Sequence, residues 1–198
     1  MFANRFTVVV DACVLVPPLT RNLLLSLAEA ELFRLRWTAN ILDEMERGAT
    51  RDLVRLERDN PAAAAKEARQ KMERAFPEAL IEGHEPLLGT IAGLPDENDD
   101  HVIAAALHVG AAQIVTDNLR HFPDHLLAPL MLEARSADDF IADTIDLPND
   151  LSTAVVAIRE LRNRLKRPAL TAKELLLRME RCGLLQTAAL LSEMEDLI

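Results

Sequence analysis

Residues 6–16 have the sequence FTVVVDACVLV, in which an apolar and β-branched run stops at a carboxylate. The run Phe6–Val10 is typical of a strand buried on both faces of a parallel sheet. Asp11 then stands at the carboxyl end of that strand, close to the core, where an ionised side chain needs a partner. This stretch predicts an α/β fold with a polar site at the end of its first strand.

The same pattern returns later in the chain, where Gln113–Thr116 is predicted as another buried strand with Asp117 directly behind it. Shorter strands are expected at Leu80–Glu82 and Leu130–Leu132. Helices are predicted between the strands because apolar residues recur there at helical spacing and capping residues precede them. The expected helix starts are Thr20, Thr38 or Asn40, Asn60 before Pro61, Pro95 with the polar cluster behind it, and Ser136. This alternation predicts an α/β/α sandwich around a mostly parallel sheet.

Pro148 marks the expected boundary between a domain of residues 1–147 and a helical C-terminal extension of residues 148–198. The extension is predicted to hold two or three helices, the first over about 150–166. Thr171 is expected to cap a helix that runs to Arg181, and Gly183 to stop it.

Length and composition bound the class of protein. The chain has 198 residues, of which 49% are hydrophobic and 27% charged, so it can bury a core as a globular protein. Two distant cysteines cannot make a disulfide framework, and we expect a cytoplasmic protein. The first residues fit neither a secretory signal nor a membrane span. A net charge of −10 argues against nucleic-acid binding by simple attraction.

Acidic side chains gather where the predicted elements meet. In an open α/β sheet, residues at strand ends and at the starts of neighbouring helices face one crevice, so Asp11 and Asp117 are expected to meet Asp99 there. Such carboxylates repel one another unless a cation neutralises them, and hard oxygen ligands select Mg²⁺ or Mn²⁺. A cation held in this way supports phosphodiester hydrolysis, which predicts a metal-dependent nuclease.

Each acid also has a plainer explanation. Asp99 or Asp100 alone fits a helix cap or a first-turn acid, and Glu44 alone fits a solvated helix residue. Asp11 and Asp117 fit this explanation less well, because each directly follows an apolar strand. Taken together, the spacing of the four acids favours one site.

Four motifs, in this order and at these intervals, resemble the PIN-domain ribonucleases: VVVDACVL, ILDEM, DDHVIAAALHVGAAQIVT and TDNLRHFP. The resemblance covers roughly residues 6–140 and is nearest to the VapC-like toxins of type II toxin–antitoxin pairs. It implies a compact α/β/α fold and Mg²⁺- or Mn²⁺-dependent cutting of RNA. It also implies a homodimer and a small antitoxin that covers the active site.

The resemblance assigns roles residue by residue. Asp11 would be the first metal ligand, Glu44 the acid on a helix and Asp99 the next ligand. Asp99 is preferred because the family's acid stands eleven positions before the glycine that ends this helix, here Gly110. Asp100 and Asp96 are the runners-up.

Two positions depart from the family pattern. Cys13 occupies the place of the usual Asn or Ser, and Asn118 the place of the usual fourth acid, with Asp117 just before it. Either Asp117 or Asn118 fills the fourth position. These departures leave an alternative, a catalytically impaired PIN-like module that binds RNA or protein. A DNA nuclease of related fold is a third hypothesis.

The remaining polar residues suggest less. A basic stretch near the C-terminus is typical of a solvated helix face, and as a minority interpretation it contacts RNA phosphates. The histidines and cysteines have no zinc-site spacing. With no Tyr and one Trp, base stacking is not expected to dominate RNA binding. The basic stretch comprises Arg159, Arg162, Arg164, Lys166 and Arg167.

Overall fold

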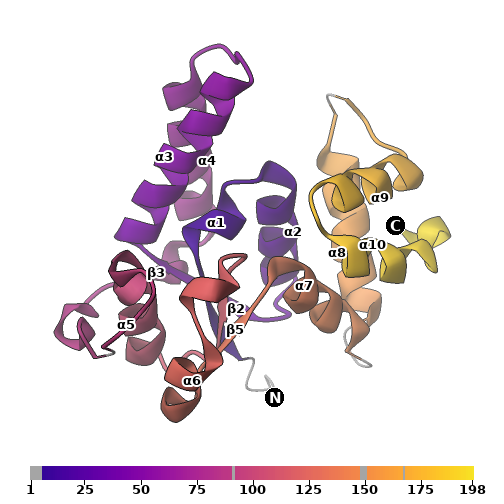
Figure 1. Ribbon diagram of the computed structural model, residues 1–198. Coiled ribbons are helices and arrows are strands. Elements are labelled where there is room, and N and C mark those ends of the chain that lie inside the picture. Colours follow the sequence, from indigo (N-terminus) through magenta and orange to yellow (C-terminus); the bar gives the residue numbers. More distant parts are fainter. Residues whose placement is uncertain (1–5, 91, 148–150, 167) are drawn as a thin grey trace. The chain divides into compact units, whose positions relative to one another are not determined.

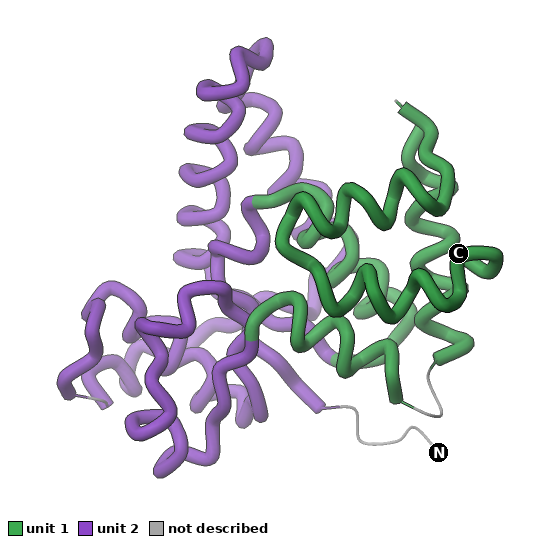
Figure 2. The backbone as a smooth tube through the Cα atoms, turned by 45° about the vertical axis from the view of Figure 1, so that its right-hand side comes forward, with its two compact units in different colours: residues 1–5, 17–33, 136–198 green, residues 6–16, 34–135 purple. Residues whose placement is uncertain are grey.

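A computed structural model describes residues 6–90, 92–147, 151–166 and 168–198 (Figure 1). These residues form two compact units, which Figure 2 draws in purple and green. The sheet unit consists of residues 6–16 and 34–135. The helical unit consists of the described residues within 17–33 and 136–198.

Five parallel strands form the sheet in the order β3-β2-β1-β4-β5. The central strand β1 pairs with β2 on one side and with β4 on the other, and its residues Val8–Val10 are fully buried. A continuous apolar run suits this position, because both faces of a central parallel strand are covered. The strands are β1 Thr7–Val10, β2 Arg34–Thr38, β3 Leu80–Ile81, β4 Gln113–Val115 and β5 Glu133–Arg135.

The strand order reverses at β1. After β1 the chain builds β2 and β3 on one side, and it then crosses to β4 and β5 on the other side. The backbone N–H of Asp11 donates to the carbonyl of Val115 at 3.0 Å, so the ends of β1 and β4 lie together. Ligand sites of open α/β sheets lie at such a reversal, beyond the carboxyl ends of the strands.

The described residues of the sheet unit form five α-helices, besides shorter 3₁₀ turns. The two long ones, α3 and α4, pack side by side (Figure 1), and Arg69 of α4 binds Asp43 and Glu46 of α3. Thr38 caps α3 by accepting a hydrogen bond from the Ile41 N–H. The helices are α1 Ala12–Leu15, α3 Ala39–Arg55, α4 Pro61–Ala75, α5 Asp100–His108 and α6 Asp124–Leu127.

The helical unit contains five further helices. Ser136 caps α7, and Thr171 forms a capping box with Glu174 at the start of α9. Asp138 of α7 accepts hydrogen bonds from the N–H groups of Gln186 and Thr187 in α10, which ties these two helices together. The helices are α2 Pro18–Glu29, α7 Ala137–Asp146, α8 Leu151–Arg164, α9 Ala172–Arg181 and α10 Leu185–Ser192.

The predicted α/β class with a parallel central sheet and C-terminal helices is confirmed. One strand prediction was wrong, and one strand was not predicted. The strand expected at Leu130–Leu132 lies at Glu133–Arg135, because Met131 has a left-handed backbone with φ of 56°. The strand Arg34–Thr38 was not predicted at all. Its two arginines hide an alternation in which Leu35, Trp37 and Thr38 are buried.

One helix start was also wrong. Thr20 does not cap α2, since that helix begins at Pro18 and Thr20 lies buried within it. Proline suits the first helical turn, where its missing N–H costs no hydrogen bond. Pro148, the expected domain boundary, lies outside the described residues. The helices α2 and α7 group with the C-terminal helices, and the division after residue 147 stays a prediction.

Candidate active site

Asp11 lies where β1 ends and α1 begins, and its side chain is held by the backbone and by the next strand. Its Oδ1 accepts a hydrogen bond from the Ala12 N–H at 2.6 Å, and its Oδ2 accepts one from the Thr116 hydroxyl at 2.7 Å. Asp11 is 3% exposed and Thr116 is fully buried. These bonds fix the carboxylate in one orientation, so it is preorganised at the carboxyl edge of the sheet.

Cys13 also supports Asp11. Its Sγ donates to Asp11 Oδ2 at 3.0 Å and accepts from the Asp117 N–H at 3.3 Å. Burial, and next the nearby charge of Asp11, raise the pKa of the Cys13 thiol to about 12. The thiol therefore keeps its proton at neutral pH and acts as a donor. Cys13 thus supplies a hydrogen bond to Asp11 from the position where the family pattern has Asn or Ser.

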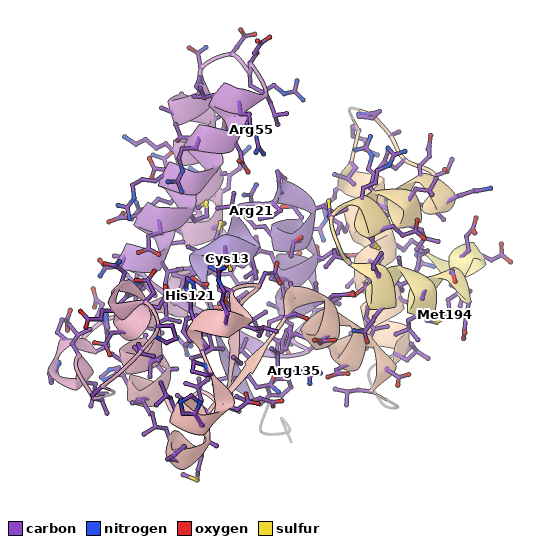
Figure 3. All side chains as sticks on the ribbon, viewed as in Figure 1. Cys13, Arg21, Arg55, His121, Arg135 and Met194 are labelled. Atoms are coloured by element: carbon purple, nitrogen blue, oxygen red, sulfur yellow. The ribbon has the colours of Figure 1, made fainter. Side chains whose placement is uncertain are left out.

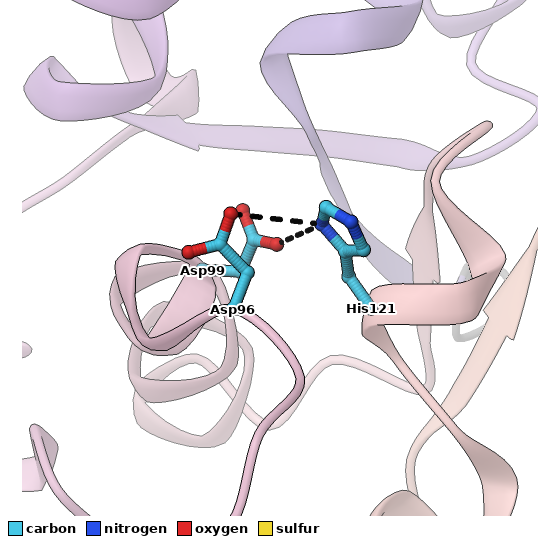
Figure 4. A group of neighbouring side chains, drawn as sticks. All are labelled: Asp96, Asp99 and His121. Atoms are coloured by element: carbon cyan, nitrogen blue, oxygen red, sulfur yellow. Dashed lines mark hydrogen bonds and ion pairs between the residues drawn. The ribbon is translucent and has the colours of Figure 1, made fainter.

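Asp99 and His121 form the second part of the site (Figure 4). His121 Nε2 accepts from Arg120 Nε at 3.2 Å, so the ring hydrogen lies on Nδ1 and is donated to Asp99 Oδ2 at 2.7 Å. Partial burial raises the pKa of Asp99, and the charge of Asp11 acts in the same direction. Both effects make the charged form of the Asp99 carboxyl group less favourable, and the hydrogen bond from His121 opposes them.

Asp96 lies beside this pair, with its Oδ2 3.9 Å from His121 Nδ1. The backbone N–H and the side-chain amide of Asn98 donate to Asp96 Oδ1 at 3.0 and 2.9 Å, and these bonds lower the pKa of Asp96. Ligand atoms of Asp96, Asp99 and His121 lie within 4.8 Å of one another. Among the described residues, these three side chains therefore lie close enough together that they could share a metal ion.

Glu44 approaches the site from α3. Its Oε1 lies 3.3 Å from Nε2 of His101, a buried residue of α5, and 3.9 Å from Nη2 of Arg47. The contact with His101 has the distance of an ion pair but not the geometry of a hydrogen bond. Glu44 is one-third exposed, so its carboxylate remains open to further ligands.

A cavity of about 450 Å³ lies at this edge of the sheet. It brings together four of the predicted acids, Asp11, Glu44, Asp96 and Asp99, with Asn118. Asp11 and Glu44 lie far in the sequence from each other and from the pair Asp96 and Asp99, and the fold brings all four to one cavity. The other lining residues are Ala12, Cys13, Val16, Arg47, Gly48, Arg51 and Asn98.

Two of the predicted acids lie elsewhere. Among the described residues that line the cavity, Asp117 and Asp100 are absent. Asp117 is exposed, and its backbone N–H donates a hydrogen bond to Cys13 Sγ. Asp100 Oδ2 accepts a hydrogen bond from the Gly89 N–H at 2.6 Å, a structural contact with the preceding loop. Asn118 therefore lies where Asp117 was expected.

The basic stretch lies in the helical unit, in α8 and directly after it. Arg164 forms an ion pair of 2.8 Å with Glu29 of α2, while Arg159 and Lys166 are exposed. Arg162 is half-buried, and Arg167 lies outside the described residues. RNA binding by this stretch stays a prediction.

Sequence reasoning missed several residues that line the cavity or contact its acids. Arg47 and Arg51 follow Glu44 by three and seven positions, a helical spacing that places them on one face of α3. That spacing was a usable signal. His121 has no zinc-site spacing, and its hydrogen bond to Asp99 depends on tertiary structure. Asn98 lies between two predicted acids, and no pattern distinguished it.

The comparisons with known proteins agree with this geometry. Residues 7–120, more than half of the chain, match the family model of the PIN domain. The chain belongs to the PIN domain family. Residues 137–193, which follow the PIN domain in the sequence, match the model of the VapC50 C-terminal domain, so the VapC-like resemblance is also confirmed.

A stretch of 58 residues is 47% identical to "Putative ribonuclease VapC50" of Mycobacterium tuberculosis (strain ATCC 25618 / H37Rv). This stretch covers 29% of the present chain and 34% of that protein, so the match spans about a third of the relative's length. A search of solved structures found no match. In the described part of the chain, no helix has the length and apolar character needed to cross a membrane.

The residues of this PIN domain fit a hard divalent cation. Asp11 and Asp99 share the cavity, and burial together with their mutual repulsion disfavours charge on Asp99. A divalent cation would relieve this cost, and carboxylate oxygens are the ligands that Mg²⁺ and Mn²⁺ prefer. His121 supports Asp99 as a hydrogen-bond donor, which leaves carboxylates as the ligand set.

Proposed function

We propose that this PIN domain is a Mg²⁺- or Mn²⁺-dependent endoribonuclease that hydrolyses RNA phosphodiester bonds. The main support for this proposal is that Asp11, Glu44 and Asp99 line one cavity at the carboxyl edge of the sheet, although they lie far apart in the sequence. The ribonuclease named among the relatives supports RNA as the substrate.

Asp11 and Asp99 would hold the cation, with Asp96 at the rim of the same cavity. When bound, the cation would supply a nucleophilic water at neutral pH and stabilise charge on the phosphoryl oxygens. The protein's own contribution is orientation. Thr116 and Cys13 fix Asp11, and His121 fixes Asp99, while such supporting contacts commonly govern metal affinity.

Glu44 is suited to proton transfer. It is one-third exposed, lies 3.9 Å from the nearest arginine nitrogen and lines the cavity beside the other acids. A carboxylate in this position can accept a proton from a water in the cavity. Asn118 supplies a neutral amide where the family pattern has an acid, so Glu44 carries more of the proton-transfer task in this chain. Asp117 would then act on the site through its backbone.

The impaired binding module remains the alternative, and Asn118 is the observation that favours it. The position of Cys13 weakens this alternative, because a protonated thiol bound to Asp11 replaces the usual Asn or Ser donor. We infer that Cys13 is compatible with catalysis.

We further propose that the nuclease is the toxin of a type II toxin–antitoxin pair. The match of residues 137–193, C-terminal to the PIN domain, to the VapC50 C-terminal domain supports this role. A cognate antitoxin would cover the cavity, the toxin would act in the cytoplasm on cellular RNA, and the protein would work as a homodimer.

The test is RNA cleavage by the purified chain with Mn²⁺, with Mg²⁺ and with EDTA. The matched variants are Asp99→Asn, which removes a charge from the cavity, and Glu97→Gln, which removes one from an exposed neighbour. We expect metal-dependent cleavage by the wild type and by Glu97→Gln, and a loss of at least about a hundredfold in Asp99→Asn. Cleavage that persists in EDTA, or in Asp99→Asn, would refute the proposal. A parallel DNA panel tests the hypothesis of a DNA nuclease.

A further inference from the structure

Three arginines form a row along α3 that starts at the cavity. Arg47, Arg51 and Arg55 are spaced four residues apart, so they lie on one side of the helix, about 6 Å apart along its axis. Arg47 and Arg51 line the cavity. Figure 3 shows Arg55 farther along α3, away from Cys13 and His121 at the edge of the sheet. The row therefore leads outward from the candidate active site.

The protein uses little of this positive charge itself. In the described part of the chain, Arg51 has no ion pair within 4.0 Å, and Arg47 has a single pair, with Glu44 at 3.9 Å. Arg55 pairs with Asp52, but both side chains are largely exposed, at 78% and 47%. Arg69 of α4 differs, because Asp43, Glu46 and Glu73 hold it.

The four-residue spacing of the three arginines is unfavourable as long as no ligand is bound. Like charges four residues apart on a helix repel each other and destabilise it. Arg47 and Arg51 line two cavities. One is the cavity that contains the four acids, and the other, of about 520 Å³, lies along α3 and α4. An anion that lies over both arginines would turn this repulsion into attraction.

The distribution of charged side chains in the cavity indicates the kind of ligand that Arg47 and Arg51 bind. Its described lining contains four carboxylates, and Arg47 and Arg51 are its only basic side chains. A phosphate chain that enters an acidic cavity of a protein with a net charge of −10 needs a local positive contact. Arginine suits this task because its planar fork binds phosphate oxygens in pairs.

We propose that Arg47, Arg51 and Arg55 bind consecutive phosphates of a single-stranded RNA and guide it into the cavity. A single row follows one backbone, which favours a single strand over a duplex. This inference rests on the proposed ribonuclease function for its substrate, but it concerns binding and does not require cleavage.

The test measures binding of a fluorescein-labelled oligouridylate to the full chain in EDTA, by anisotropy at several salt concentrations. The double variant Arg47→Gln/Arg51→Gln should bind at least about tenfold more weakly at low salt. The slope of log K against log[salt] should become shallower by about 1.4, because each phosphate contact on a single strand contributes roughly 0.7.

Two further variants separate charge from structure. Arg47→Lys/Arg51→Lys keeps the charge and should restore the wild-type slope, with part of the affinity lost because lysine lacks the planar fork. Arg178→Gln/Arg181→Gln removes the same charge from two exposed positions of α9 and should bind like the wild type. Circular dichroism checks that each variant is folded.

The outcomes separate this inference from the proposed function. If the wild type binds RNA and Arg47→Gln/Arg51→Gln keeps its affinity and slope, the arginine row is refuted and the nuclease proposal stands. If the slope changes instead in Arg159→Gln/Arg162→Gln, the C-terminal basic stretch is the RNA surface and the row is again refuted. If the row binds RNA but Mn²⁺ produces no cleavage, the nuclease proposal fails alone. If the wild type binds no RNA, the row is refuted whatever the cleavage assay gives.

Discussion

The Thr116 hydroxyl donates a 2.7 Å hydrogen bond to Asp11 Oδ2 across 105 positions of the sequence. Both residues follow directly behind a strand, Asp11 behind β1 and Thr116 behind β4, and both are buried. Because β1 and β4 are neighbours in the sheet, the hydroxyl of Thr116 lies next to the carboxylate of Asp11 in the candidate active site.

Replacing Thr116 by Val keeps the shape of the side chain and removes this donor. We expect a loss of about 1–3 kcal/mol in the free energy of unfolding, because a buried carboxylate oxygen loses a partner. Affinity for Mn²⁺ should fall roughly 10–100-fold. Urea unfolding in EDTA and calorimetric titration with Mn²⁺ measure the two effects. Thr116→Ser keeps the hydroxyl and is the control, and equal losses in both variants would show that the donor is irrelevant.

Cys13 should resist alkylation. Since burial and Asp11 raise the pKa of its thiol to about 12, very little thiolate is present at pH 8. Cys182 is exposed and serves as the internal reference. Mass spectrometry after a timed reaction with iodoacetamide should show Cys182 modified at least about tenfold faster than Cys13. Faster modification of Cys13 would contradict its assignment as a protonated donor.

Asp99 should make the metal-free protein less stable as the pH rises. Its pKa is raised in the folded state, so the folded protein holds this proton more tightly than the unfolded chain does. The stability from the protonated form is fully present below the unfolded pKa and is lost as the pH rises through the folded pKa. Asp99→Asn should therefore be more stable than the wild type in EDTA at neutral pH and lose this advantage at low pH.

Mn²⁺ should reverse that ranking. A cation that binds only the folded wild type at about 100 times its dissociation constant adds roughly 2.7 kcal/mol of stability. Urea unfolding across the pH range, with EDTA or Mn²⁺, measures both effects. An Asp99→Asn variant that is less stable than the wild type in EDTA at neutral pH would contradict the assigned cost of the Asp99 charge.

Gly48 sets the distance between α1 and α3. A Cβ atom at this position would lie 2.6 Å from Cγ2 of Val16, which is too close for two carbons. Gly48→Ala should therefore destabilise the protein by about 1–3 kcal/mol through overpacking, although the same change in an open helix would be favourable. Val16→Ala should relieve the clash in the double variant. Urea unfolding of the single and double variants tests this, and a stabilised Gly48→Ala protein would disprove it.

The sequence predicted those parts of the site that depend on local pattern. Asp11 was recognisable because an acid ends an apolar run, while the resemblance to PIN-domain ribonucleases favoured Asp99 over Asp100, through its distance of eleven positions from Gly110. In the structure, Asp99 lines the cavity and Asp100 binds the loop at Gly89. The catalytic roles of both acids stay proposals.

Features that depend on tertiary structure could not be predicted from the sequence. The hydrogen bond from His121 to Asp99 joins a short 3₁₀ turn to the start of another helix, and no pattern marks it. The strand Arg34–Thr38 was missed because its two arginines, of which Arg34 is exposed and Arg36 half-buried, mask the alternation of buried residues. Asn118, rather than Asp117, lines the cavity because the chain turns after Thr116, whose Oγ1 accepts the Asn118 N–H at 3.1 Å.

The central claim is that Asp11 and Asp99 together hold a divalent cation. Anomalous diffraction from a crystal soaked in Mn²⁺ tests it most directly, because the signal locates the ion without assumptions about activity. We predict one strong peak about 2.0–2.3 Å from carboxylate oxygens of both residues, and none in Asp99→Asn crystals. A saturating soak that leaves this cavity without a peak, or that places Mn²⁺ on other residues, would contradict the account.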